Sequence, residues 1–371
     1  MTAGDDRLTL ALCGDVMTGR GVDQALPHPG DPRLWEAYVP DARGYLALAE
    51  AASGAVPRPV DPGWLWGDAL PLLAGAQPDL RVINVETSIT HSDDVAPGKL
   101  VHYRMAPENI EAITVARPDA CVLANNHVLD FGPQGLADTL GALSGAGIAT
   151  VGAGMDAEQA ARPAVVPVAS GGRVLVFAYG ATSSGIPRAW AATPQRAGVA
   201  LLPDLSHQIA DEVAGRVQDL KQPGDVVIVS IHWGTNWGYE VPAGQVEFAH
   251  RLIDGGVDVV HGHSSHHPRP VEVYRDRLIL YGCGDFIDDY EGVDGYAEYR
   301  DDLRLLYFAS VAASTGALIS LGLVPLRVRR LRLGRAPAPD VRWLQETLDA
   351  ISRDYGSRFD VDEQGTLVLR M

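Results

Sequence analysis

Five short apolar runs in this sequence each end at a side chain that can bind a metal ion, and this pattern constrains the fold more than any other feature. The runs have the length and the apolar content of buried strands. The residues that follow them are Asp15, Glu86, Asn126 with His127, His232, and a histidine-rich segment at 261–267. Because ligands collect at the carboxyl ends of strands in α/β sheets, we expect these side chains to share one sheet edge.

Helix-like segments separate the apolar runs. Residues 135–144 carry leucines at helical spacing, and 205–220 and 246–253 have amphipathic patterns. We expect a further helix at 341–351 and a hairpin between the runs 271–274 and 278–281. Strands that alternate with helices indicate an α/β protein.

We find no internal repeat and expect a single domain over residues 1–371. Residues 27–63 are rich in Pro, Gly and Ala and are expected to be an insertion, and residues 300–371 to be a C-terminal extension of strands and a helix. Trp35, Trp64 and Trp66 lie in or beside the insertion. They either form a lid over a substrate or pack the insertion onto the core.

The net charge of −17 argues against a nucleic-acid partner, because phosphate neutralisation needs clustered Lys and Arg. The cysteines, Cys13, Cys121 and Cys283, are widely spaced, which favours a reducing compartment over a disulfide framework. The first residues are acidic where a signal peptide is basic, and no stretch reaches the ~18–20 apolar residues of a membrane span. We therefore expect a cytoplasmic protein without a membrane anchor.

Carboxylate, amide and imidazole groups together suit a transition metal such as Zn²⁺, Mn²⁺ or Fe²⁺. One or two such ions would bring the pKa of a bound water toward ~7 and so supply a nucleophile. Each residue also has a plainer interpretation: Asp15 as a turn or helix N-cap, Glu86 as a surface charge, His232 as a buried, hydrogen-bonded imidazole. The joint pattern favours the metal site, because four histidines within 261–267 follow a buried-strand pattern directly.

Six short motifs occur along the chain. Each alone is weak evidence for a family, but their order and spacing together are specific. The motifs are 14–20 (GDVMTGR), 84–87 (NVET), 124–130 (ANNHVLD), 231–234 (IHWG), 262–266 (GHSSH) and 278–286 (LILYGCGDF). On these motifs the sequence resembles the CapA family of poly-γ-glutamate and capsule synthesis proteins, which is related to the calcineurin-like metallophosphoesterases. The resemblance runs from about Leu8 to about Asp289.

The resemblance implies a metallophosphoesterase-like α/β/β/α sandwich, in which two mixed sheets pack together between helices. It implies that the metal ligands are Asp15, Glu86, Asn126, His232, His263 and His266, with Glu86 as the bridge between two ions. It also implies that His127, held by Asp130, acts as general acid or stabilises the transition state. The residues expected to bind substrate are Arg20, Arg104, Trp233 and Asp285.

Three departures from the metallophosphoesterase pattern leave the number of ions open. Met17 stands where that pattern has the histidine of Asp-x-His, and Glu86 is one methylene longer than the usual Asp. The last motif is stretched to His-Ser-Ser-His. The sequence therefore leaves open whether one or two ions bind, and which of the histidines at 261, 263, 266 and 267 coordinate them.

Together these features predict a metal-dependent hydrolase or transferase that acts on a γ-glutamyl or peptide-like amide bond, or on a phosphoester. The expected substrate is a small or peptide-like acidic molecule whose carboxylate pairs with Arg20 or Arg104. Two alternatives remain: a non-catalytic partner of a polymer-synthesis or export complex, and a tailoring enzyme of secondary metabolism. The sequence does not decide between a monomer and a homo-oligomer.

Overall fold

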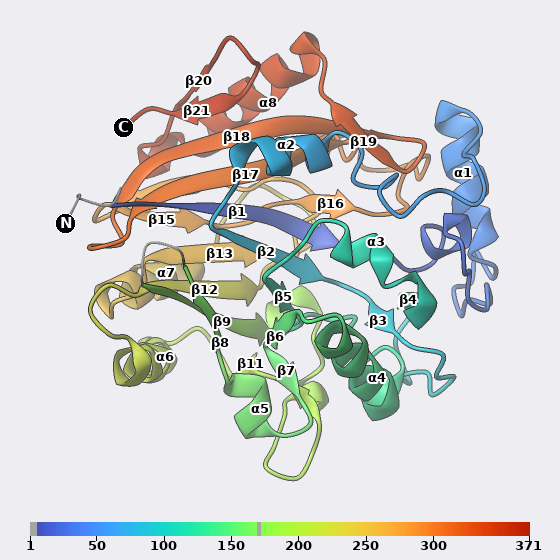
Figure 1. Ribbon diagram of the computed structural model, residues 1–371, viewed down its shortest axis with the longest axis horizontal. Helices are drawn as coiled ribbons and strands as arrows, with labels where there is room; N and C mark the ends of the chain where they lie inside the picture. The colour runs from blue at the N-terminus through green and yellow to red at the C-terminus, as the bar shows by residue number, and fades with distance from the viewer. Residues whose placement is uncertain (1–5, 169–171) are drawn as a thin grey trace.

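Two β-sheets packed face to face form the centre of the computed structural model, which describes residues 6–168 and 172–371 (Figure 1). The parallel half of the first sheet contains β1 (Arg7–Val16), β2 (Leu80–Val85), β5 (Ala120–Val122), β6 (Ala149–Val151) and β16 (Asp285–Ile287). Its antiparallel half contains β17 (Leu303–Ala312), β18 (Leu318–Arg329), β19 (Arg332–Arg335), β20 (Phe359–Val361) and β21 (Leu367–Leu369). The strand order is β20-β21-β18-β17-β1-β2-β5-β6, with β16 beside β1 and β19 beside β18.

The second sheet is mostly parallel. Its strands are β8 (Ala164–Pro167), β9 (Arg173–Ala181), β11 (Leu201–Leu202), β12 (Val226–His232), β13 (Val259–His263), β14 (Val271–Tyr274) and β15 (Arg277–Leu280). They follow the order β11-β9-β12-β13-β15-β14, with β8 antiparallel to β9. The hairpin of β14 and β15 is the one predicted from the sequence.

Helices cover the outer faces of both sheets (Figure 1). The first sheet carries α1 (Arg43–Ser53), α2 (Ala69–Ala76), α3 (Glu111–Thr114) and α4 (Gly132–Gly145). The second carries α6 (His207–Leu220) and α7 (Ala243–Asp254), with α5 (Ala157–Ala161) near its β9 edge. The C-terminal helix α8 (Ala338–Ile351) packs against β18 and β20. The helix predicted at 205–220 begins two residues later because the Ser206 side chain caps it, accepting a hydrogen bond from the backbone of Ile209.

Both faces of β1 are buried, which explains its nearly continuous apolar sequence. Leu8, Leu10 and Leu12 point into the core between the sheets. Ala11 and Cys13 alternate with them and face the core beneath the outer helices. β12 shows the same alternation, so each sheet joins two apolar layers. This arrangement confirms the predicted α/β/β/α sandwich.

Shorter elements connect these layers. Two small ladders pair β3 (Ser88–Ile89) with β4 (Arg104–Met105) and β7 (Ala153–Gly154) with β10 (Gly198–Val199). Single 3-10 turns occur at Asp23–Ala25, Pro107–Asn109, Thr182–Ser184, Arg188–Trp190, Ala297–Tyr299 and Arg353–Tyr355. Trp66 is buried beneath the first sheet's helices and donates a hydrogen bond to the Ala112 carbonyl, so it packs the core.

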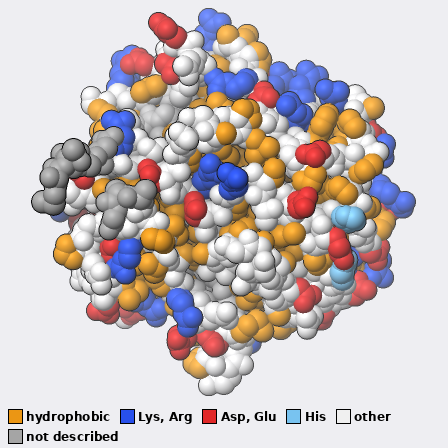
Figure 2. Space-filling model, viewed as in Figure 1, with side chains coloured by type: hydrophobic (Ala, Val, Ile, Leu, Met, Phe, Trp, Pro, Cys, Tyr) orange, Lys and Arg blue, Asp and Glu red, His pale blue; other side chains and the backbone are white. Residues whose placement is uncertain are grey.

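The face in Figure 2 carries Lys and Arg side chains dispersed among acidic and apolar ones. Among the helices of the described ranges, none combines the length and the apolar character that crossing a bilayer requires.

Candidate metal centre

Three buried side chains from three different strands converge at the carboxyl edge shared by the two sheets. They are Asp15 of β1, His232 of β12 and His263 of β13, and their candidate ligand atoms all lie within 4.8 Å of one another. His232 and His263 are register partners on neighbouring parallel strands, which brings their Nδ1 atoms to 2.7 Å. Asp15 Oδ1 lies 3.6 Å from His263 Nδ1. The structure therefore brings these three residues together at one sheet edge, where the sequence predicted them.

The position of Asp15 depends on a glycine that allows close strand contact. A β-carbon on Gly14 would lie 1.5 Å from the Gly284 carbonyl oxygen, so only glycine lets the end of β1 meet the chain at β16. Asp15 is then held from two sides. Asn84 donates to its Oδ1 at 2.7 Å, and the backbone N–H of Ser264 donates to its Oδ2 at 3.1 Å.

Glu86 and Asn126 lie on the other side of His232. Asn126 Oδ1 is 2.8 Å from His232 Nε2, and Glu86 Oε1 is 3.6 Å from the same nitrogen. Asn84 links the two acids, because its amide also donates to Glu86 Oε2 at 3.2 Å. This bridging role was missed in the sequence, where an amide inside the apolar run 80–85 was the available signal.

Burial shifts the pKa values of the acids and histidines in this centre. It raises the pKa of Asp15 to about 7, with a further contribution from the nearby carboxylate of Asp285. Burial, followed by the charge of Asp15, raises the pKa of Glu86 well above its ordinary value. The pKa values of His232 and His263 fall well below 6.5 because both imidazoles are buried. The centre thus combines neutral imidazoles with acids whose charged forms are disfavoured by burial and by neighbouring carboxylates.

These residues fit a transition-metal ion. Neutral imidazole nitrogens and carboxylate oxygens are the ligands that Zn²⁺, Mn²⁺ and Fe²⁺ accept, and a cation would relieve the crowding of acids. Among the described residues, the buried Oδ2 of Asp285 has no hydrogen-bond partner, which leaves an acceptor beside Asp15 for further ligation. Asp15, His232 and His263 form the central set, and Glu86 with Asn126 could serve a second ion.

His127 belongs to a separate buried group beside Glu86. Its Nδ1 lies 2.6 Å from Asp130 Oδ2, and its Nε2 faces Glu86 Oε1 at 3.9 Å. Lys99 is paired with the same Asp130 carboxylate and with the backbone carbonyl of Asn126. Burial lowers the pKa of His127 to about 4. Lys99 was missed in the sequence, where the available signal was that it is one of only two lysines.

The four histidines left open by the sequence have different surroundings. His263 alone joins the three-residue group. His261 lies 3.0 Å from Ser230 Oγ and 2.9 Å from the Cys13 carbonyl oxygen. His266 pairs with Asp285 at 2.9 Å, and His267 stacks on Tyr299. Burial lowers the pKa of His266, but Asp285 outweighs it and leaves that pKa raised.

The residues predicted to bind substrate lie in four different environments. Arg20 is buried and its guanidinium bonds Asp289 and Glu36. Arg104 bonds the Ser92 carbonyl and Asp93. Trp233 is buried in the outer core of the second sheet, where its indole donates to the Tyr281 carbonyl. Asp285 lies beside Asp15, its register partner on β16.

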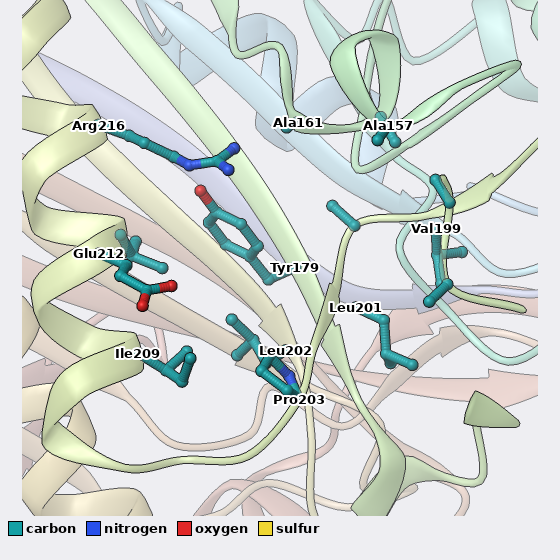
Figure 3. A pocket seen from close by; sticks show the side chains of 15 residues that line it. Ala157, Ala161, Tyr179, Val199, Leu201, Leu202, Pro203, Ile209, Glu212 and Arg216 are labelled. Carbon is teal, nitrogen blue, oxygen red and sulfur yellow. The ribbon is translucent and has the colours of Figure 1, made fainter. Parts of the chain in front are cut away.

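A cavity of about 170 Å³ lies elsewhere, between α5, α6 and the β9 edge of the second sheet (Figure 3). Its walls are mainly alanine and leucine, and the Tyr179 hydroxyl points toward the Arg216 guanidinium. None of the candidate metal ligands is among the described residues that line it. This cavity is therefore not part of the candidate metal centre.

The family model and the curated relatives with a named role indicate one family. Residues 9–290 match the family described as bacterial capsule synthesis protein PGA_cap. A probable polyglutamine synthesis accessory protein of Mycobacterium tuberculosis is 54% identical over 359 residues, covering 96% of this chain and 94% of that protein. The capsule biosynthesis protein CapA of Bacillus anthracis is 25% identical over 88% of this chain and 68% of its own length. A solved phosphatase of Mycoplasma pneumoniae is 12% identical, with a TM-score of 0.45 over 91% of this chain and 96% of that one.

Proposed function

The chain belongs to the PGA_cap family of bacterial capsule synthesis proteins, and from this premise we propose that it is a metal-dependent hydrolase or transferase of γ-glutamyl polymer metabolism. The observation that carries the proposal is the convergence of Asp15, His232 and His263, whose ligand atoms lie within 4.8 Å of one another. This buried set of acids and imidazoles is costly to desolvate, and such sets cluster at functional sites, which supports the proposal.

In the proposed site, Asp15, His232 and His263 would hold a transition-metal ion, with Glu86 and Asn126 available beside His232. Such an ion supplies Lewis acidity, which makes a hydroxide nucleophile available near neutral pH. Asn84 holds both Asp15 and Glu86 in place through its amide hydrogens.

His127 is the proposed proton-transfer residue. Because Asp130 accepts a hydrogen bond from its Nδ1, the second nitrogen, Nε2, is left free on the side of Glu86. In the neutral imidazole this nitrogen carries the lone pair, so it can accept a proton at the centre and then pass it to the leaving group of a substrate. Lys99 fixes the Asp130 carboxylate and so fixes the orientation of the imidazole.

The bond proposed first is an amide, and the phosphoester is the second candidate. The relative in Mycobacterium tuberculosis is named for polyglutamine synthesis, and a Bacillus subtilis relative, 25% identical over 82% of this chain and 69% of its own length, is named a PGA biosynthesis protein. Polymers of glutamate are joined by amide bonds. A non-catalytic role is the competing proposal, since the first of these relatives is called an accessory protein.

An activity screen on metal-reloaded protein tests the proposal. The protein is stripped with a chelator, reloaded separately with Mn²⁺, Zn²⁺ and Fe²⁺, and assayed on chromogenic γ-glutamyl amides and phosphoesters. We expect turnover only after reloading, and its loss in Asp15→Asn. The control Asp219→Asn removes an equal charge from an exposed position and should retain activity. If every reloaded form is inert on both substrate classes, the accessory role replaces the enzyme.

A further inference from the structure

A cavity of about 220 Å³ opens beside His266, between the loop after β12 and the segment 290–301. Four aromatic side chains line it: Tyr45, Trp237, Tyr290 and Tyr296. His266 connects this cavity to the candidate metal centre, because it pairs with Asp285, the neighbour of Asp15 across β1 and β16. A molecule in the cavity is therefore separated from Asp15 by the pair of His266 and Asp285.

The aromatic rings surround the approach to His266. Trp237 and Tyr296 stack in parallel, with ring centroids 3.8 Å apart and an interplanar angle of 3°. The Trp237 ring lies 5.2 Å from the His266 ring, and Tyr290 meets the same imidazole edge-on at 5.1 Å. The faces of such rings carry negative electrostatic potential and attract cations.

The formal charges of the cavity favour the same kind of ligand. Arg20 is its only arginine, and all three of its guanidinium nitrogens are bonded to Asp289 or Glu36. Asp301 is the only carboxylate in the lining. Within residues 6–168 and 172–371, its side chain has no hydrogen bond or ion pair, and the nearby Arg304 is bonded to Asp288. His266, the other ionisable group of the lining, is paired with Asp285, so Asp301 is the lining charge without a direct partner in this part of the chain.

We propose that this cavity binds a primary ammonium group of the substrate against the ring of Tyr290 and the carboxylate of Asp301, with Trp237 as a neighbour in the lining. The inference rests on the proposed function, since it assigns one end of the same substrate. An ammonium gains attraction from the rings and from Asp301, whereas a carboxylate meets an acid and a fully bonded arginine. The substrate class is then a peptide-like amide with a free amino group.

Binding of a small probe tests the subsite without turnover. n-Butylammonium, n-butanol and butyrate have similar length and differ in charge. Their binding to the full chain, metal-free and Zn²⁺-loaded, is measured by calorimetry and ligand-observed NMR. We expect n-butylammonium to bind most tightly, and Asp301→Asn to weaken it at least about tenfold.

A matched variant separates the subsite from the general attraction of a chain with a net charge of −17. Asp294 is exposed in the same segment and does not line the cavity, so Asp294→Asn should leave binding unchanged. Trp237→Leu should also weaken n-butylammonium, which covers the case in which Asp301→Asn fails to fold. Equal binding of butyrate, or equal losses in the Asp301 and Asp294 variants, overturns the proposal.

The same experiment distinguishes this inference from the proposed function. If n-butylammonium binds through Asp301 but the reloaded protein turns over no substrate, the ammonium subsite holds and the hydrolase fails. If the protein hydrolyses amides, acetylation of a substrate's amino group should raise KM with a smaller effect on kcat. An unchanged KM on acetylation contradicts the subsite while leaving the hydrolase intact.

Discussion

The ammonium group of Lys99 is paired with the carboxylate of Asp130, 31 positions further along the chain, and this carboxylate also lies 2.6 Å from His127 Nδ1. The same carboxylate accepts from the backbone N–H of Tyr103 at 2.7 Å. Asp130 thus has three partners, Lys99, His127 and the Tyr103 backbone, and Lys99 neutralises its charge. The orientation of His127 depends on this neutralised carboxylate.

Lys99→Met is expected to destabilise the protein by about 3 kcal/mol, because removing one partner of a buried ion pair leaves the other charge uncompensated. Chemical denaturation measures this loss. The double variant Lys99→Met/Asp130→Asn should recover part of it, since no unpaired carboxylate remains. A single variant as stable as the wild type would show that Asp130 does not need the lysine.

Arg20→Met is expected to cost about 3 kcal/mol for the same reason, since it leaves Asp289 buried without its guanidinium. It also removes the cation over the rings of Tyr45 and Tyr103, at 3.8 and 4.3 Å. The affinity for n-butylammonium should not fall in this variant. A loss of affinity for butyrate instead would indicate that Arg20 binds anions, as the sequence predicted.

Trp233→Phe is expected to lower stability by about 2 kcal/mol, because it leaves a small cavity and removes the hydrogen bond to the Tyr281 carbonyl. Metal content and KM should stay at wild-type values. Trp237→Phe provides the contrast, with a smaller effect on stability and a measurable effect on n-butylammonium binding. Changes in KM for Trp233→Phe alone would support the predicted substrate role of Trp233.

Asp225, which is not part of the candidate metal centre, is expected to make the stability of the fold depend on pH. Burial raises its pKa, but the hydrogen bonds from Arg173 and the Gln222 backbone outweigh burial, so the pKa lies below 3.8. A lowered carboxyl pKa stabilises the fold above the unfolded pKa, and this stability is lost as pH falls through the folded pKa. Arg173→Gln should be less stable than the wild type at pH 6, and the difference should shrink below about pH 4. Urea unfolding between pH 2 and 6 measures this.

The control for that series is Arg342→Gln, which changes an exposed arginine of α8. Arg342 has no ion pair within the described ranges, so its effect on the free energy of unfolding should not vary with pH in this window. A constant difference for Arg173→Gln would contradict the assignment of the acid sensitivity to Asp225.

Short-range patterns predicted the α/β class and the meeting of Asp15, His232 and the histidine segment 261–267, whereas the two-sheet sandwich was implied by the family resemblance. Apolar alternation defines strands, and parallel strands deliver their carboxyl ends to one edge. Neither inference needs the long-range contacts of the chain. The structure confirms the fold, and the roles of Asp15, His232 and His263 as ligands remain predictions.

The roles of Arg20, Arg104 and the individual histidines could not be predicted, because they depend on contacts that no local sequence pattern encodes. Arg20 looked free to bind an anion because its partner Asp289 lies 269 positions away. The choice among the four histidines depends on the turn at Ser264, whose φ of 105° carries His266 away toward Asp285. Arg104 likewise takes its partners from a neighbouring loop, which sequence spacing does not reveal.

Metal content tests the central claim most directly. Elemental analysis of the purified protein, reloaded and then desalted, should find at least about one transition-metal ion per chain. Asp15→Asn, His232→Asn and His263→Asn should each lose it, whereas His207→Gln, on the exposed face of α6, should keep it. A wild-type protein that holds no metal, or ligand variants that hold as much as the wild type, would contradict the account.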